Sequence, residues 1–259
     1  MAAAETKTEN KSERLVTVVT EALLPFGLDI VQPFDVSLYN DLSSTNTNLI
    51  ALPDFGRRRT LGLLIGNTRL LWPPFIEAFH NAPKLNDNPD PLDSYVESAI
   101  KNGVDQLQAS VETGAEIRFG HHLGAQFVSL VHLAQLSSLA TISPVQMAVH
   151  PQYGLWFGLR AAMILDADFV DTASTDEDSA HEENADEDGK TSSPCHGCDA
   201  PCKATLDRLT ANEQQVDEAD QWQRWVQVRD ACPVGRQMRY SDEQVQYHHS
   251  KDQKLILKQ

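Results

Sequence analysis

The chain has 259 residues, of which 41% are hydrophobic and 22% charged, enough for one large domain or two small ones without disulfide bridges. Asp plus Glu (37) outnumber Lys plus Arg (21), so the formal net charge is −16. Such an acidic chain is not expected to bind nucleic acid through bulk electrostatics or to favour an anionic membrane surface. The longest apolar runs, such as Leu155–Leu165, contain an arginine and are too short to cross a bilayer. Residues 1–14 have no apolar segment of the kind found in a secretory signal, so we expect a soluble, cytoplasmic protein.

Apolar spacing predicts the elements of the first two thirds of the chain. In chain order they are a helix over 13–24, an edge strand over 28–38 interrupted by Pro33, a buried strand over 60–65, helices over 72–82 and 93–113, a strand over 116–119, a helix over 123–139, and a hairpin of strands 145–149 and 155–165 around the turn 151–154. No GxGxxG or GxxxxGK[ST] motif occurs, which argues against a Rossmann or P-loop fold. We therefore expect an α+β fold in which helices flank a central antiparallel sheet.

The acidity is concentrated in one later segment. Nine acidic residues and no lysine or arginine lie between Asp171 and Asp188, and no apolar side chain larger than alanine follows Ala173 there. Such a segment cannot bury enough surface to offset its ordering entropy, so we predict a disordered loop, either a solvated insertion or a docking site for a basic partner. The predicted domains are a disordered terminus (1–12), an α+β body (13–166), this acidic loop (167–191) and a C-terminal segment packing on the body (192–259).

The C-terminal segment carries a helical pattern over 210–231 and a capping box, SDEQ, that predicts a short helix starting near Asp242. It also holds every cysteine of the chain, namely Cys195, Cys198, Cys202 and Cys232. The first three are spaced C-x2-C-x3-C, and Gly197 lets that loop fold tightly. This spacing suits a zinc site or an iron–sulfur cluster; a redox dithiol and unrelated surface thiols are the alternatives. Cys232 is the expected fourth ligand, and its rivals are His196, His248 and His249.

Four stretches in order resemble one family. They are PFGLDIVQPF over 25–34 running into YNDL over 39–42, DPLD over 90–93, HPQYGLWFGLR over 150–160, and RDA over 229–231 followed by RYSDEQ over 239–244 and Tyr247. Together they resemble the cobalamin-processing proteins of the combined methylmalonic aciduria and homocystinuria type C family, over about residues 13–258. The resemblance implies a flavin-reductase or nitroreductase-like α+β fold that binds base-off cobalamin. It further implies removal of the upper axial ligand: cyanide by reduction with reduced flavin (FMN or FAD), and alkyl groups by transfer to the glutathione thiolate.

The resemblance also implies roles for individual residues. Arg160 and Arg229 match two arginines that bind the glutathione carboxylates, a task that suits the bidentate guanidinium, and we assign them as catalytic. Lys254 matches a third basic position, where lysine cannot give the same bidentate contact. The cobalamin contacts implied in the same way are Tyr39, Asn40, His132, His150, Trp156 and Phe157. For each of these the alternative is an ordinary core residue.

The cysteine group has no counterpart in the animal proteins of this family. One hypothesis is that a cluster held by these thiols delivers electrons to cobalt in place of glutathione. The leading interpretation is a cytoplasmic cobalamin-binding reductase and chaperone, of the cyanocobalamin reductase or alkylcobalamin dealkylase type, that passes cobalamin to a downstream trafficking protein. The alternatives are a flavin- or iron–sulfur-dependent oxidoreductase without corrin, and a non-enzymatic, zinc-stabilised cobalamin carrier.

Overall fold

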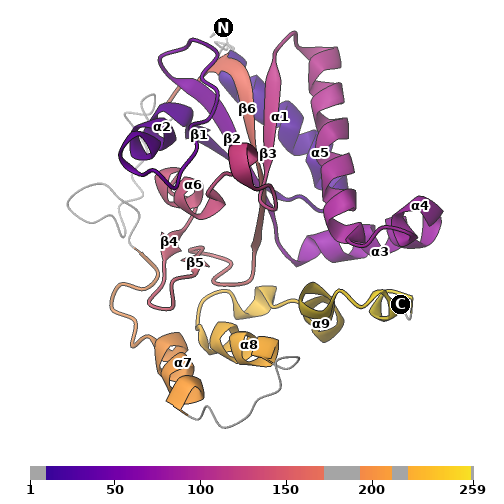
Figure 1. Ribbon diagram of the computed structural model, residues 1–259, viewed down its shortest axis with the longest axis vertical. Coiled ribbons are helices and arrows are strands. Elements are labelled where there is room, and N and C mark those ends of the chain that lie inside the picture. The colour runs from indigo at the N-terminus through magenta and orange to yellow at the C-terminus, as the bar shows by residue number, and fades with distance from the viewer. Residues whose placement is uncertain (1–9, 172–192, 212–220, 258–259) are drawn as a thin grey trace, which may run out of the picture.

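A computed structural model describes residues 10–171, 193–211 and 221–257 (Figure 1). Within these ranges the centre is a four-stranded antiparallel sheet, which confirms the expected α+β architecture. Its strands, in spatial order, are β1 (Ile30–Asp35), β2 (Thr60–Asn67), β6 (Gly158–Asp168) and β3 (Ala115–Phe119). None of the described helices combines the length and the apolar character that a membrane-spanning helix needs.

Helices cover both faces of the sheet because the central strands are apolar on both sides. Every residue of β2 is buried, and successive side chains of a strand point to opposite faces. Leu61 and Leu63 pack with one group of helices, whereas Leu64 packs with the other. The first group is α1 (Lys11–Leu23), α3 (Trp72–Asn81) and α5 (Pro91–Ser110), with the short α4 (Pro83–Asn86) beside it, and the second is α2 (Val36–Thr45) and α6 (Leu130–Leu136).

Two predicted elements are shorter than expected. The predicted strand over 28–38 ends at Asp35, because the carboxylate of that residue accepts the N–H of Ser37 at 3.0 Å and caps α2. The predicted helix over 123–139 is confined to α6. Before α6, extended backbone at Phe127 separates it from a single turn, η3 (Gly124–Gln126). After α6, the left-handed Ser138 (φ 58°) prevents the helix from continuing.

The predicted hairpin of 145–149 and 155–165 is wrong. The short strand β5 (Ala148–Val149) pairs with β4 (Thr141–Ile142) in a separate two-stranded sheet, whereas β6 pairs with β2 and β3. A bridge between His150 and Gly154 closes the intervening turn. The chain then crosses to the C-terminal segment, where Trp156 is buried, before it enters β6.

The C-terminal segment forms α7 (Pro201–Ala211), α8 (Gln221–Ala231) and α9 (Asp242–Ser250), with the turns η6 (Arg236–Met238) and η7 (Gln253–Leu255). The single helix predicted over 210–231 is thus α8 plus the end of α7, and residues 212–220 lie outside the described ranges. The predicted start of α9 is confirmed, since the Ser241 hydroxyl accepts the N–H of Gln244. Tyr247 and Ile256 join the core of α1, α3 and α5. Two predicted boundaries are wrong, because β6 extends to Asp168, within the predicted acidic loop (167–191), and α1 begins at Lys11, within the predicted disordered terminus (1–12). The disorder of the remaining residues stays a prediction, because residues 1–9 and 172–191 lie outside the described ranges.

Gly62 lies on β2, at a position where its neighbour β1 leaves no space for a side chain. Phe34 lies opposite it in the register, and a Cβ added at Gly62 would overlap the Phe34 ring. We expect Gly62→Ala to lower the free energy of unfolding by about 1–3 kcal/mol, the usual cost of overpacking a core, as measured by urea denaturation. Adding Phe34→Leu should recover part of this loss, and an unchanged urea midpoint for Gly62→Ala alone would contradict the packing described.

Candidate functional site

A cleft with a volume of ≈ 600 Å³ lies where α5, α6, α9 and the start of β6 meet. Its apolar lining residues are Phe127, Val128, Leu130, Val131 and Leu159. Its polar lining residues are Asp93, His121, Ser129, Arg160, His248 and Lys251. A cleft with this mixed lining suits a large ligand that is mostly apolar and is oriented by a few polar contacts.

Arg160 is one of the polar residues that line the cleft, and two other side chains contact its guanidinium. Its Nε donates to Asn67 Oδ1 at the end of β2 (2.6 Å), and its Nη1 lies 3.9 Å from Asp93 Oδ1 in the first turn of α5. The side chain is 16% exposed. The guanidinium is therefore fixed at the rim of the sheet, where a ligand carboxylate would find a bidentate partner.

Arg229, the second predicted arginine, lies on α8 and is not among the residues that line the cleft. Its Nε and Nη2 both donate to the carbonyl of Leu155, at 2.9 and 2.6 Å, and its guanidinium carbon lies 4.2 Å from the centre of the Trp156 ring. Burial lowers the pKa of Arg229. Both arginines act on the electrostatics of His248, so the structure brings Arg160 and Arg229 to one neighbourhood.

Tyr39 and His132 meet through one serine at the start of α6. The buried Tyr39 hydroxyl accepts the N–H of Ser129 at 3.0 Å, and the Ser129 hydroxyl lies 2.6 Å from His132 Nδ1. Burial raises the pKa of Tyr39. Since Ser129 lines the cleft, two of the predicted cobalamin contacts are linked to its wall.

Asn40 has a structural task in this arrangement. Its side-chain amide donates to the Leu52 carbonyl (2.9 Å) and accepts the Leu52 N–H (2.8 Å), so it holds the segment after α2. Trp156 is 1% exposed; the Arg229 guanidinium lies over its ring, and the centre of the Tyr240 ring is 5.5 Å from its own. A cobalamin contact for either residue stays a prediction.

His150 and Phe157 form an aromatic group with Tyr153. His150 stacks on Tyr153 with ring centres 4.1 Å apart, and its Nδ1 accepts the backbone N–H groups of Gln152 and Tyr153. Burial lowers the pKa of His150, which favours the neutral ring that these two donors require. Phe157 packs in the cluster of α2 and α6, whereas Trp156 packs with α8.

Lys254 is exposed on η7 and does not line the cleft. Lys251, the left-handed C-cap of α9, lines it instead and pairs with Asp90 at 2.8 Å. Lys251 was not among the predicted site residues, and His248 was predicted only as a rival metal ligand. The signal was available, because a helix starting after Ser241 places positions 244, 248 and 251 along one face.

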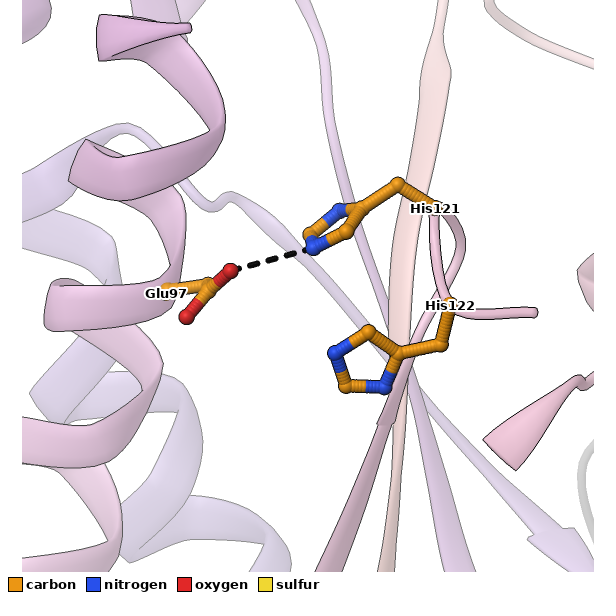
Figure 2. Close-up of side chains that lie close together, drawn as sticks. All are labelled: Glu97, His121 and His122. Atoms are coloured by element: carbon orange, nitrogen blue, oxygen red, sulfur yellow. Dashed lines mark hydrogen bonds and ion pairs between the residues drawn. The ribbon is translucent and has the colours of Figure 1, made fainter. Parts of the chain in front are cut away.

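A second unanticipated group lies at the rim of the cleft. Within the described ranges, one set of three metal-ligating side chains has all its ligand atoms within 4.8 Å, namely Glu97, His121 and His122 (Figure 2). His121 Nε2 lies 3.0 Å from Glu97 Oε1, and Lys101 pairs with Glu97 Oε2 at 2.8 Å. Although burial opposes the shift, Lys101 and His121 lower the pKa of Glu97. The carboxylate is thus already neutralised by side chains of this chain.

The four cysteines line a separate, small apolar pocket. All four are free thiols, with Cys202 and Cys232 buried and Cys195 and Cys198 half-buried. Burial raises the pKa of Cys195, and the three other cysteines raise it further. The structure therefore gathers the residues that the spacing had grouped, and their role as metal ligands stays a prediction.

Comparison with known proteins places these features in context. No family model matches the chain. In sequence it is 25% identical over 162 residues to the Bos taurus protein named cyanocobalamin reductase / alkylcobalamin dealkylase, a match that covers 57% of this chain and 55% of the bovine one. The chain thus matches about half the length of this relative. The resemblance in sequence is confirmed.

A solved structure shares the fold over nearly the whole chain. It is the crystal structure of a C. elegans B12-trafficking protein, CblC, described as a human MMACHC homologue. The TM-score is 0.65 at 16% sequence identity, and the superposition covers 95% of each chain. The α+β fold is therefore shared with that protein, and the finer flavin-reductase or nitroreductase-like label stays a prediction.

His248 should make stability depend on pH. Its Nε2 is buried without a hydrogen-bond partner in the described structure; burial, and then the cationic Arg160, Lys251 and Arg229, hold its pKa well below the usual value. The unfolded chain takes up a proton below about pH 6.5 that native His248 does not, so stability falls as the pH falls. Urea denaturation at pH 7 and at pH 5 measures how much unfolding free energy each protein loses over this range. We expect the loss to be smaller for His248→Gln than for the wild type, by up to about 2 kcal/mol. Equal losses would show that His248 titrates normally.

Proposed function

We propose that this chain is a cobalamin-binding reductase that takes up base-off cobalamin, removes its upper axial ligand by decyanation or dealkylation, and passes the product to a downstream trafficking protein. The bovine relative is named for these two reactions, and the C. elegans neighbour is described as a B12-trafficking protein. The observation that carries the proposal is the cleft with its mixed apolar and polar lining, because a fold alone does not define a function.

The cleft fits part of the cobalamin molecule. Its volume lies within the range of about 300–1,000 Å³ usual for pockets of drug-sized ligands, and cobalamin is larger than such ligands. We therefore infer that the apolar lining residues around Leu159 cover one face of the corrin, while the rest of the cobalamin molecule stays at the open side of the cleft.

Among the polar lining residues, the buried His248 Nε2 has no hydrogen-bond partner in the described part of the chain, as expected of a group whose partner is a ligand.

Ser129 lines the cleft and connects it by hydrogen bonds to Tyr39 and His132. In the base-off form the lower nitrogen base leaves cobalt, which reduces electron donation to the metal and eases its reduction. The hydrogen-bonded series from Tyr39 to His132 gives the displaced base a fixed set of donors and acceptors at the start of α6. We assign His132 as the polar partner of the displaced base.

Arg160 is the residue we assign to the thiol co-substrate. In dealkylation the glutathione thiolate attacks the alkyl carbon and leaves two electrons on cobalt; in decyanation a reduced flavin supplies the electrons. Asp93 lies 3.9 Å from Arg160, too far for a direct hydrogen bond, so a ligand carboxylate can take that place. Lys251 supplies a second cation to the lining of the cleft. We place this activity in the cytoplasm, where thiols are kept reduced.

A methylcobalamin titration tests the corrin site. We expect the visible spectrum to change from base-on to base-off and to saturate near one equivalent of protein. Leu159→Gln should weaken binding by about tenfold or more, because burying a leucine side chain contributes about 1.5–3 kcal/mol. Leu123→Gln is the matched control, since that side chain is 82% exposed and lies outside the cleft. The absence of any spectral change with the wild type would instead favour an oxidoreductase without corrin.

Arg160→Gln separates the thiol from the corrin. Losing a charged hydrogen-bond donor costs about 1.5–3 kcal/mol, so the KM for glutathione in dealkylation should rise by about tenfold or more while base-off binding stays near one equivalent. Arg57→Gln is the control, because Arg57 pairs with Asp166 and Asp168 at the far end of β6. A KM that Arg160→Gln leaves unchanged would remove Arg160 from the glutathione site.

A further inference from the structure

Two segments, the stretch 195–202 and the end of α8, bring every cysteine of this chain to one pocket. Cys195 and Cys198 lie in the loop before α7, Cys202 lies in the first turn of α7, and Cys232 directly follows the end of α8. The rest of the pocket is mainly apolar and includes Val149, Leu155, Pro194 and Val234. Chance would distribute four cysteines over the whole chain, yet the first 194 residues contain none.

The loop that carries the first pair is built as a tight turn. The N–H of Cys198 donates to the carbonyl of Cys195 at 3.2 Å, and the N–H of Cys195 donates to the Ser193 hydroxyl at 3.3 Å. Gly197 makes the turn possible with a left-handed φ of 67°. Such a turn presents two thiols from the same side, as the C-x2-C spacing of thiolate metal sites requires.

We propose that Cys195, Cys198, Cys202 and Cys232 bind one thiolate metal centre, either a zinc ion or an iron–sulfur cluster. Four cysteines complete the ligand set of both, and each thiol loses its proton on binding. Among the described residues, no three of these sulfurs all lie within 4.8 Å of one another. A single zinc ion with Zn–S bonds of about 2.3 Å would draw the side chains inward, whereas a cluster, which gives each thiolate its own iron, holds its ligands farther apart.

The position of this centre gives it a structural consequence. The N–H of Cys232 donates to the carbonyl of Arg229 at 3.2 Å, and the Arg229 side chain donates to the carbonyl of Leu155, which itself lines the cysteine pocket. A bound metal therefore fixes the end of α8, and through it Arg229 against Trp156. Metal binding itself does not depend on the proposed function.

Metal analysis of the full chain tests the proposal. After anaerobic purification we expect either about one zinc ion per chain, or iron and acid-labile sulfide with a broad visible absorption, as expected for a four-cysteine centre. The four thiols should resist iodoacetamide until a chelator or acid releases the metal. The proposal would be overturned if the protein held only traces of zinc and iron, both after purification and after reconstitution, and if iodoacetamide alkylated all four thiols of the native protein freely.

Single variants test the ligand set. Cys198→Ser and Cys232→Ser should each lower the metal content by about tenfold or more, since loss of one thiolate opens a closed site. His196→Ala is the matched control, because this exposed residue lies between Cys195 and Cys198 and should leave the metal content unchanged. Full metal content in Cys198→Ser would contradict the four-thiolate assignment. The methylcobalamin titration of the same wild-type sample is scored separately, so a failed titration with metal bound removes the proposed function and leaves this inference standing.

Discussion

The complete burial of β2 is the constraint on which the rest of the molecule depends. A strand buried on both faces needs helices on both sides, and it needs a neighbour that is equally apolar. That neighbour is β6, whose residues 161–165 are fully buried. Arg160 stands just before this run, at the first position where the strand leaves the core, and Asn67, at the corresponding end of β2, receives its Nε–H. Arg160, a polar residue of the cleft, thus directly precedes the apolar core residues of β6.

The C-terminal segment completes what the sheet begins. It contributes His248 and Lys251 to the cleft, and it reaches the main core through Tyr247 and Ile256. The same segment carries Arg229, which stabilises the crossing at Leu155 and Trp156 before β6. A chain ending at the sheet would therefore lack two of the polar groups of the cleft, His248 and Lys251.

The sequence predicted the elements whose signal is local. The helix of α5 and the strand β2 follow from long periodic or continuous apolar patterns, and the Ser241 capping box marks the start of α9. Strand pairing was not predictable in this way: residues 145–149 and 155–165 are both apolar, and only tertiary packing sends them to different sheets. Arg160 was identified through the family resemblance, because it ends the matching stretch HPQYGLWFGLR. Lys251 was missed because a lysine at the end of a short helix is ordinary.

Asp90 links the start of α5 to the end of α9. One oxygen of its carboxylate accepts the N–H of Asp93 and caps the start of α5, while the other pairs with Lys251 at the end of α9. Lys251 holds this position with a left-handed φ of 54°, a conformation that L-residues adopt at an energetic cost. The same carboxylate therefore supports the first turn of α5 and the last residue of α9, so loss of Asp90 would weaken both helix ends at once.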